Sequence, residues 1–556
     1  MFKSGLATIG LLIASQTALA QQVPLGAGGQ LQQIPPATAP DKPAADIRIL
    51  RPEATRQPDL AGSTIRVNQL IVDGNLSFPD ADLVAASGVT PGSDLTLGQL
   101  RDAAASIAAY YNARGFILAQ AYVPAQDVSA GNVTIAVVEG RLGAVEIRNN
   151  STLSGALVRN VLGGLDEGAA VTAAPLERRL LLLSDIPGVR VSSTLAPGAE
   201  VGTSNLLVDV APGRAITGSI EADNGGNRYT GEYRAGGTIY FNNPTGSGDQ
   251  ASLRLLGSTG GLAYGRAAYQ TLVGKATVGA AFTHLRYALG REFEVLDADG
   301  TADILSVFGS YPLIRSRTAN LNALAGVEAR RLEDRLGSLG AEGDKRIGAG
   351  TLGLSGDSRD TLAGGGWNAA SLGWTLGHLN LDTPLERAID AATARSQGRY
   401  NKVQFTAARL QTLSGPLSLY GSLRGQLAFD NLDSSEKMQL GGAYGVRAYP
   451  EGEAYGDEGY LATLEARLLL SRWTGSLPGQ IQLIGFADVG EVRYANDPWF
   501  TGSNHTTRSG IGAGLTWAGS HGLVARTSYA TRLGDQPVTS GPDKSGRFWF
   551  QISKLF

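Results

Sequence analysis

The chain has 556 residues, more than one ordinary domain, and it has no cysteine, which excludes disulfides and thiol chemistry. Its formal net charge of -3 is too small to indicate a nucleic-acid partner. The 75 glycines and 2 methionines are unlike an ordinary α/β enzyme and favour a large antiparallel sheet, in which glycine allows tight turns and close strand packing.

The first 20 residues have the pattern of a secretory signal peptide. A basic start at Lys3 precedes an apolar stretch from about Leu6 to Ala14, and an A-x-A triplet ends at Ala20. The stretch is too short to span a bilayer, and no later segment offers about 18 consecutive apolar residues. We therefore expect cleavage between Ala20 and Gln21, and export of the mature chain; the alternative is a buried N-terminal helix.

Residues 21–62 are rich in proline and show little periodicity. Such a composition cannot bury a core and predicts a linker. Within it, residues 28–34 (GGQLQQI) can form one or two turns of helix before Pro35 and Pro36 stop the helix.

A first small α+β domain is predicted over residues 63–142. Alternating apolar residues indicate a strand over 65–72, and Thr96 can cap a helix whose apolar stripe runs from Leu97 to Tyr111. Two further strands are expected near 117–123 and 133–138.

The same order of elements recurs over residues 143–213. The expected elements are a strand near 144–148, helices near 154–162 and 175–183, and strands near 190–194 and 205–210. A repeat at a period of roughly 75 residues indicates a string of small domains rather than a solenoid.

From residue 214 to residue 556 helical spacing gives way to alternation of apolar and polar residues. In 461–470, alanines and leucines alternate with Thr463, Glu465 and Arg467. A soluble sandwich would alternate too, but strands of about ten residues in an exported chain match the length that crosses a bilayer when tilted.

The number of strands follows from the length of this region. About 340 residues, at roughly ten per strand plus alternating short and long connections, predict an all-β transmembrane barrel of about sixteen antiparallel strands. The last strand fits a barrel that closes by pairing its first and last strands, because Phe548, Phe550, Ile552 and the terminal Phe556 share one face.

Two segments of the barrel region carry candidate functional residues. Residues 445–459 are too rich in glycine, proline and charge for a lipid-facing strand, so they predict a long loop that contains Arg447. Residues 485–490 predict a strand that turns Phe486 and Asp488 toward the lumen. A lumenal carboxylate needs water or a cation, and an inward-folded loop could bring Arg447 to it. The residues alone leave this pair open against a solvated arginine and an ordinary pore-wall charge.

The order of these parts resembles the two-partner secretion transporters, the hemolysin secretion/activation proteins of the outer-membrane assembly-factor superfamily. The first domain looks like the POTRA domain of that family, and the loop and strand resemble its V-R-G-Y/F and F-x-D-x-G motifs. The matching segments are Tyr110–Phe116, Tyr122–Pro124, Val138–Leu142, Asp223–Gly226, Tyr229–Gly231, Val446–Tyr449 and Phe486–Gly490. The sequence departs from the motif at Ala448, which would be strained if the position requires a positive φ.

The resemblance implies a fold and a function. It implies a sixteen-stranded barrel behind two POTRA domains, with the sixth outer loop folded inward and Arg447 paired with Asp488. The N-terminal helix near 28–34 can act as a plug, and the POTRA domains would capture an unfolded partner in the periplasm by strand addition. The site residues implied for transport are Val446, Arg447, Ala448, Tyr449, Phe486, Asp488 and Gly490.

We therefore expect an outer-membrane exporter with periplasmic N-terminal domains, no cofactor and no catalytic site. The expected partners are a secreted β-helical adhesin or hemolysin (TpsA-like), outer-membrane lipid and, during biogenesis, the barrel assembly machinery. The alternatives are an outer-membrane assembly factor of the same superfamily, a passive porin and a barrel-embedded hydrolase. A G-x-G-x-x-G match at 348–353 lies in a glycine-rich strand rather than a βαβ unit, and the four histidines are too scattered for a metal site.

Overall fold

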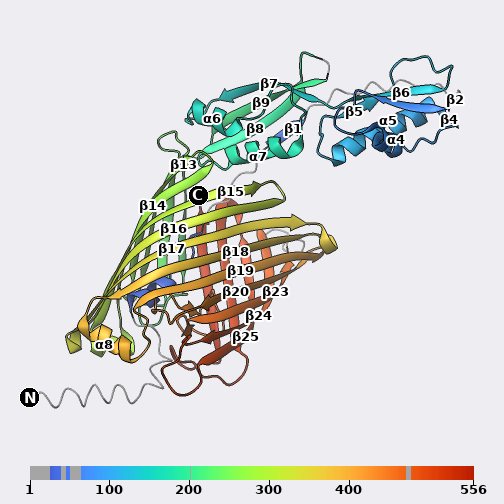
Figure 1. Ribbon diagram of the computed structural model, residues 1–556. Helices are drawn as coiled ribbons and strands as arrows, with labels where there is room; N and C mark the ends of the chain where they lie inside the picture. The colour runs from blue at the N-terminus through green and yellow to red at the C-terminus, as the bar shows by residue number, and fades with distance from the viewer. Residues whose placement is uncertain (1–25, 39–45, 50–63, 201, 471–477) are drawn as a thin grey trace, which may run out of the picture. The chain divides into compact units, whose positions relative to one another are not determined.

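The computed structural model describes residues 26–38, 46–49, 64–200, 202–470 and 478–556. The chain forms two compact units (Figure 1). One unit comprises residues 42–215 and 245–248, and the other comprises residues 1–41, 216–244 and 249–556. The predicted cleavage site between Ala20 and Gln21 lies outside the described residues.

The first α+β domain contains a three-stranded sheet in the order β3-β6-β5. Buried and exposed residues alternate along its strands, and the buried ones pack with two helices, the second of which Thr96 caps. The predicted strand over 65–72 is divided at Asn68, because β2 pairs with β4 while β3 pairs with β6. The elements are β2 Thr64–Val67, β3 Gln69–Asp73, α4 Asp80–Ser87, β4 Ser93–Thr96, α5 Leu97–Ala113, β5 Gln120–Tyr122 and β6 Asn132–Val138.

A buried carboxylate ties this domain together. Glu139 accepts hydrogen bonds from the backbone N–H groups of Leu76 (2.8 Å) and Ser77 (2.7 Å). The hydroxyls of Ser77 (2.8 Å) and Tyr111 (2.9 Å) also donate to it. Burial acts to raise the pKa of Glu139, but the four hydrogen bonds outweigh burial and hold this pKa below its ordinary value.

The second α+β domain contains a four-stranded sheet in the order β1-β8-β9-β7. Its edge strand β1 comes from the proline-rich segment ahead of the first domain, which was expected to be a linker, and runs parallel to β8. The elements are β1 Asp46–Ile49, β7 Arg141–Asn149, α6 Gly155–Leu162, α7 Ala173–Ser184, β8 Val189–Pro197 and β9 Thr203–Pro212.

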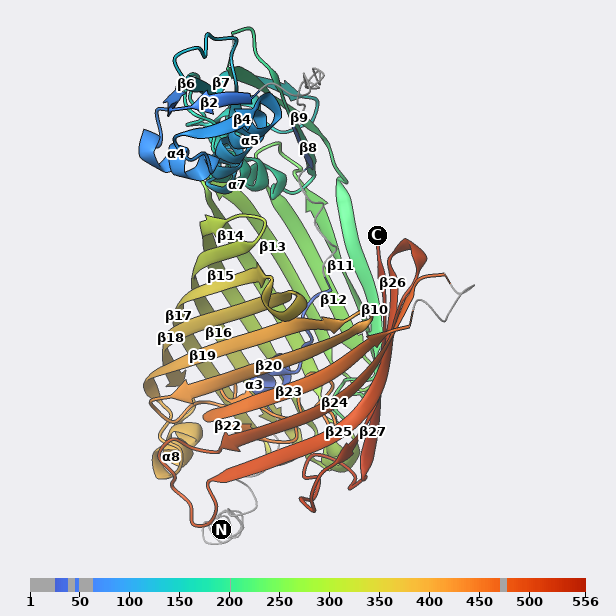
Figure 2. The same cartoon turned by 90° about the vertical axis from the view of Figure 1, so that its right-hand side faces the viewer.

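Sixteen antiparallel strands form a closed barrel, in which β27 pairs with β10 (Figure 2). The predicted barrel and its strand number are therefore confirmed. The strands are β10 Ile216–Asp223, β11 Arg234–Asn242, β12 Gln250–Ser258, β13 Ala263–Val273, β14 Ala276–Ala288, β15 Ala298–Arg315, β16 Ala319–Leu336, β17 Ala341–Asp360, β18 Gly366–Leu381, β19 Gly398–Ser414, β20 Leu417–Ala428, β23 Glu458–Leu469, β24 Gln480–Arg493, β25 His505–Ala518, β26 Leu523–Arg532 and β27 Gly546–Leu555.

The two faces of the wall differ as the alternation predicts. Along β24, Leu483 and Val489 are exposed on the outer face, while Phe486 and Asp488 are buried on the inner face. The G-x-G-x-x-G match at 348–353 lies within β17. No helix in the described ranges is long and apolar enough to cross a membrane.

A short helix, α3 (Ala27–Gln32), lies inside the barrel (Figure 2). Asp334 of β16 accepts a hydrogen bond from the backbone N–H of Ala27 at 2.7 Å, and Arg234 of β11 donates to the backbone carbonyl of Gln33 at 2.8 Å. The Gln33 side chain donates to the hydroxyl of Tyr455 at 2.7 Å. Both ends of the helix are thus bound by side chains of the barrel unit.

Candidate functional site: an inward loop on the barrel wall

The connection between β20 and β23, residues 429–457, is the sixth outer loop of the barrel. It contains the short pair β21 (Met438–Gln439) and β22 (Tyr455–Gly456). Val446, Ala448 and Tyr449 of this loop have no exposed surface, because they pack with inner-wall residues such as Phe486. The loop therefore folds into the barrel rather than standing in solvent.

Arg447 and Asp488 meet in a bidentate ion pair. The Arg447 Nε donates to Asp488 Oδ2 at 2.8 Å, and Nη2 donates to Oδ1 at 2.7 Å. The backbone N–H of Arg447 also donates to Oδ2 (3.2 Å), and the Thr463 hydroxyl donates to Oδ1 (2.9 Å). The Asp488 side chain is 1% exposed and that of Arg447 14%, so the pair is largely withdrawn from water. This fork geometry is the strongest that an arginine and a carboxylate can form.

Three further wall residues hold Arg447. Its Nη1 donates to Glu465 Oε1 at 2.8 Å, and its guanidinium carbon lies 3.4 Å from the centre of the Phe486 ring. The indole N–H of Trp549, on the last strand, donates to the Arg447 carbonyl oxygen at 2.7 Å. Alternation groups Glu465 with Thr463 and Arg467 on one face of its strand, but it does not identify Glu465 as a partner of Arg447, because alternation gives the face of a residue and not its neighbours in space.

Ala448 fits its position without strain. Its φ is not positive, so the backbone strain expected for a residue other than glycine at this position is absent. Gly510 of β25 supplies the room, because a Cβ on Gly510 would lie only 2.4 Å from the Ala448 Cβ. Gly490 of β24 makes similar room for Leu440, whose Cδ2 would lie 2.7 Å from a Cβ at that position. The small residues on the wall are therefore complementary to the shape of the loop.

Acidic residues attach the rest of the loop to the wall and to the connection between β26 and β27. Glu453 pairs with Arg508 at 3.0 Å and accepts backbone hydrogen bonds from Thr539 and Ser540. Two further carboxylates, each on the first half of the loop, face wall cations. Their pairs are Glu436 with Lys402 (2.7 Å) and Arg330 (2.5 Å), and Asp433 with Lys345 (3.0 Å). The sequence does not predict these anchors; the glycine-rich, charged segment 445–459 contains Glu453, but Asp433 and Glu436 lie outside it.

Comparisons with known proteins agree with this architecture. Residues 202–517 match the family model of haemolysin secretion/activation proteins ShlB/FhaC/HecB, and residues 65–140 match the model of the POTRA domain, ShlB-type. The heme/hemopexin transporter protein HuxB of Haemophilus influenzae (strain 86-028NP) is 27% identical over 476 residues, which cover 84% of this chain and 82% of HuxB. The outer membrane transporter CdiB of Dickeya dadantii (strain 3937) is 24% identical over 470 residues, covering 82% of this chain and 78% of that protein.

Solved structures share the fold. CdiB from Escherichia coli superposes with a TM-score of 0.67 at 20% identity, covering 91% of this chain and 93% of that one. BamA from Haemophilus ducreyi lacking POTRA domains 1–3 gives a TM-score of 0.53 at 14% identity, covering 88% of this chain and 100% of that one. A POTRA-bearing unit, a closed barrel and a family match over more than half of the chain lead to one conclusion: this chain belongs to the haemolysin secretion/activation protein family ShlB/FhaC/HecB, as an outer-membrane transporter that translocates a partner protein in two-partner secretion.

Proposed function

We propose that the first POTRA domain captures an extended segment of the unfolded partner by strand addition to β3. β3 is an edge strand of its sheet, and no other strand of the described chain pairs with its free side. A cavity of about 690 Å³, lined by residues including Ile71, Val84 and Ala85, lies between β3 and α4. Strand addition supplies main-chain hydrogen bonds with little demand on sequence, and the cavity can receive side chains of the added strand.

The barrel supplies the second part of the proposal, a gated lumen. The observation that carries it is that α3 and the loop over 429–457 both lie inside the barrel and are held there by side-chain contacts. A passive porin has no need of two such segments. We assign the control of the gate to Val446, Arg447, Ala448 and Tyr449 on the loop and to Phe486, Asp488 and Gly490 on the wall. This role is transport without a catalytic step.

The partner is proposed to be one large secreted protein, a β-helical adhesin or hemolysin (TpsA-like). The names of the relatives support a protein or ligand transport role, since HuxB is named for heme/hemopexin and CdiB as an outer membrane transporter. The outward apolar side chains of the wall, such as Leu483 and Val489, would contact outer-membrane lipid. Insertion of the barrel itself is assigned to the barrel assembly machinery of the cell.

Deletion of the transporter tests the proposal. One large protein should disappear from the cell surface and the medium and accumulate in the periplasm, while the other outer-membrane proteins keep their levels. General failure of outer-membrane assembly would instead support an assembly factor, and loss of small-solute uptake alone would support a porin.

A pair of variants on α4 tests capture. Ala85→Trp fills the cavity beside β3 and should reduce export of the partner by at least about tenfold if an added strand uses that cavity. Asp82→Trp is the matched control, because Asp82 is exposed on the same helix but does not line the cavity. Equal export by the two variants would contradict capture at this groove.

A further inference from the structure

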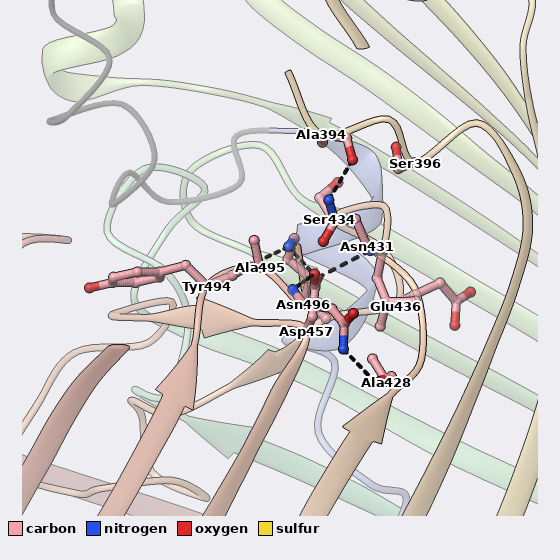
Figure 3. A network of polar contacts seen from close by, with 12 residues as sticks. Ala394, Ser396, Ala428, Asn431, Ser434, Glu436, Asp457, Tyr494, Ala495 and Asn496 are labelled. Carbon is pink, nitrogen blue, oxygen red and sulfur yellow. Dashed lines mark hydrogen bonds and ion pairs between the residues drawn. The ribbon is translucent and has the colours of Figure 1, made fainter. Parts of the chain in front are cut away.

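Three outer loops of the barrel meet in one cluster of buried polar contacts (Figure 3). They are the fifth loop (382–397), the sixth loop (429–457) and the seventh loop (494–504), which connect β18 to β19, β20 to β23 and β24 to β25. The contacts lie at the base of the sixth loop, away from Arg447 and Asp488. They therefore bear on how this loop is held rather than on its pairing with the wall.

Asp457 is the centre of the cluster and has no exposed surface. Its Oδ1 accepts the backbone N–H of Leu432 at 3.2 Å and pairs with the Lys437 ammonium. Leu432 and Lys437 lie on the segment that leaves β20, and Asp457 is the last residue before β23. One carboxylate thus joins the two legs of the sixth loop, by which we mean the segment that follows β20 and the segment that precedes β23.

The same carboxylate reaches the seventh loop. Its Oδ2 accepts the backbone N–H of Asn496 at 2.9 Å, and Lys437 donates to the carbonyl oxygen of Tyr494 at 2.8 Å. The Asn496 side chain donates back to the carbonyl oxygen of Ala428, at the end of β20, at 2.8 Å.

Asn431 extends the cluster to the fifth loop. Its side-chain amide donates to the carbonyl oxygens of Ala394 (2.7 Å) and Asp497 (2.8 Å), and its Oδ1 accepts the backbone N–H of Asp497 (2.7 Å). The amide is therefore bonded to the fifth and seventh loops at once, and all three loops are joined by side chains of the sixth loop.

We propose that Asp457 is a positioning residue that clamps the two legs of the sixth loop to each other and to the seventh loop, so that the outer mouth of the barrel opens only when this cluster separates. The second half of this statement rests on the proposed gated export. Loss of the carboxylate leaves the Lys437 ammonium, whose side chain is only 15% exposed, without its anion, and a largely buried charge without a partner is unfavourable. The legs would then separate as Lys437 moves to water.

The chain has no cysteine, so a single reporter thiol can test the clamp. Ala495, next to Tyr494 and Asn496 in the chain, is fully buried, and an Ala495→Cys reporter should resist a membrane-impermeant maleimide on intact cells. Adding Asp457→Ala should raise the labelling rate at least about tenfold, because labelling follows the population of the open state. Asp457→Asn keeps an oxygen for the Leu432 N–H but not the charge, and should give an intermediate rate.

Arg395→Ala is the matched control. Arg395 of the fifth loop pairs with Asp497 of the seventh loop at 2.9 Å, within the same group of three loops, but both side chains are exposed, so its loss should leave the labelling rate unchanged. A rate in both Asp457 variants equal to that of the unaltered reporter, with a folded barrel, overturns the clamp. Faster labelling with unchanged export supports the clamp and contradicts the gated export on which its functional half rests.

Discussion

Replacement of Arg447 by alanine is the sharpest test of the inward loop. The change removes the two guanidinium bonds to Asp488 and the one to Glu465, and it leaves the Asp488 side chain, 1% exposed, without a cation. Breaking a buried pair in this way costs about 3–5 kcal/mol. The lower end applies here, since the Thr463 hydroxyl and the backbone N–H of residue 447 still donate to Asp488. About 3 kcal/mol corresponds to roughly a hundredfold shift of the loop away from the wall.

The shift can be measured with a Val446→Cys reporter, since Val446 is fully buried and cysteine is smaller. Labelling by an impermeant maleimide should rise in the Arg447→Ala background, and export of the partner should fall. Arg447→Lys should resemble alanine more than arginine, because an ammonium cannot reproduce the fork.

Arg467→Ala is the control for this test. Arg467 donates to the same Glu465, at 2.7 Å and 2.9 Å, but its bonds do not reach Asp488. It should therefore affect labelling and export much less. Undiminished export by Arg447→Ala with normal barrel insertion would remove Arg447 from the transport mechanism.

Three further predictions follow from individual contacts. Gly510→Ala should destabilise the seated loop by about 1–3 kcal/mol, because its Cβ would lie 2.4 Å from that of Ala448 and 3.0 Å from the Thr531 carbonyl oxygen. Adding Ala448→Gly removes the shorter contact and should restore part of the stability; unfolding of the reconstituted barrel measures both changes, and no recovery would refute the steric argument. Asp334→Ala removes the acceptor for the N–H of Ala27 and should raise single-channel conductance in planar bilayers, whereas Tyr287→Phe, which keeps the carboxylate, should not. In the folded domain the pKa of Glu139 lies below its ordinary value of 4.5, so the ionised carboxylate stabilises the fold above pH 4.5, and this stabilisation is lost as the pH falls through the folded-state pKa. Glu139→Gln should therefore flatten the acid dependence of hydrogen exchange in the first POTRA domain. An unchanged pH profile would refute this role of Glu139.

The parts that sequence could predict are those that local pattern determines. Alternation predicted the barrel and the inner face of Asp488, whereas the approach of Arg447 to that residue was implied only by the resemblance to the secretion family. The capped helix from Leu97 was also predictable, because Thr96 and Gln99 form a capping box within one turn.

The remaining contacts depend on chain segments that meet only after folding. Glu453 meets Arg508, and Asp457 meets Asn496, across 55 and 39 positions of the sequence. The sequence of a glycine-rich loop does not distinguish a charged side chain that is solvated from one that is buried against a partner. The parallel strand β1 escaped prediction for a related reason: its partner β8 lies beyond an entire intervening domain.

That strand has a consequence for the second POTRA domain. Asp46–Ile49 lies along β8 in register with Ser192–Leu195, and the other side of β8 is paired with β9. Any foreign strand that adds to β8 at these positions must first displace β1. The segment Asp46–Ile49 is therefore a competitor for that sheet edge, present at a fixed effective concentration because it belongs to the same chain.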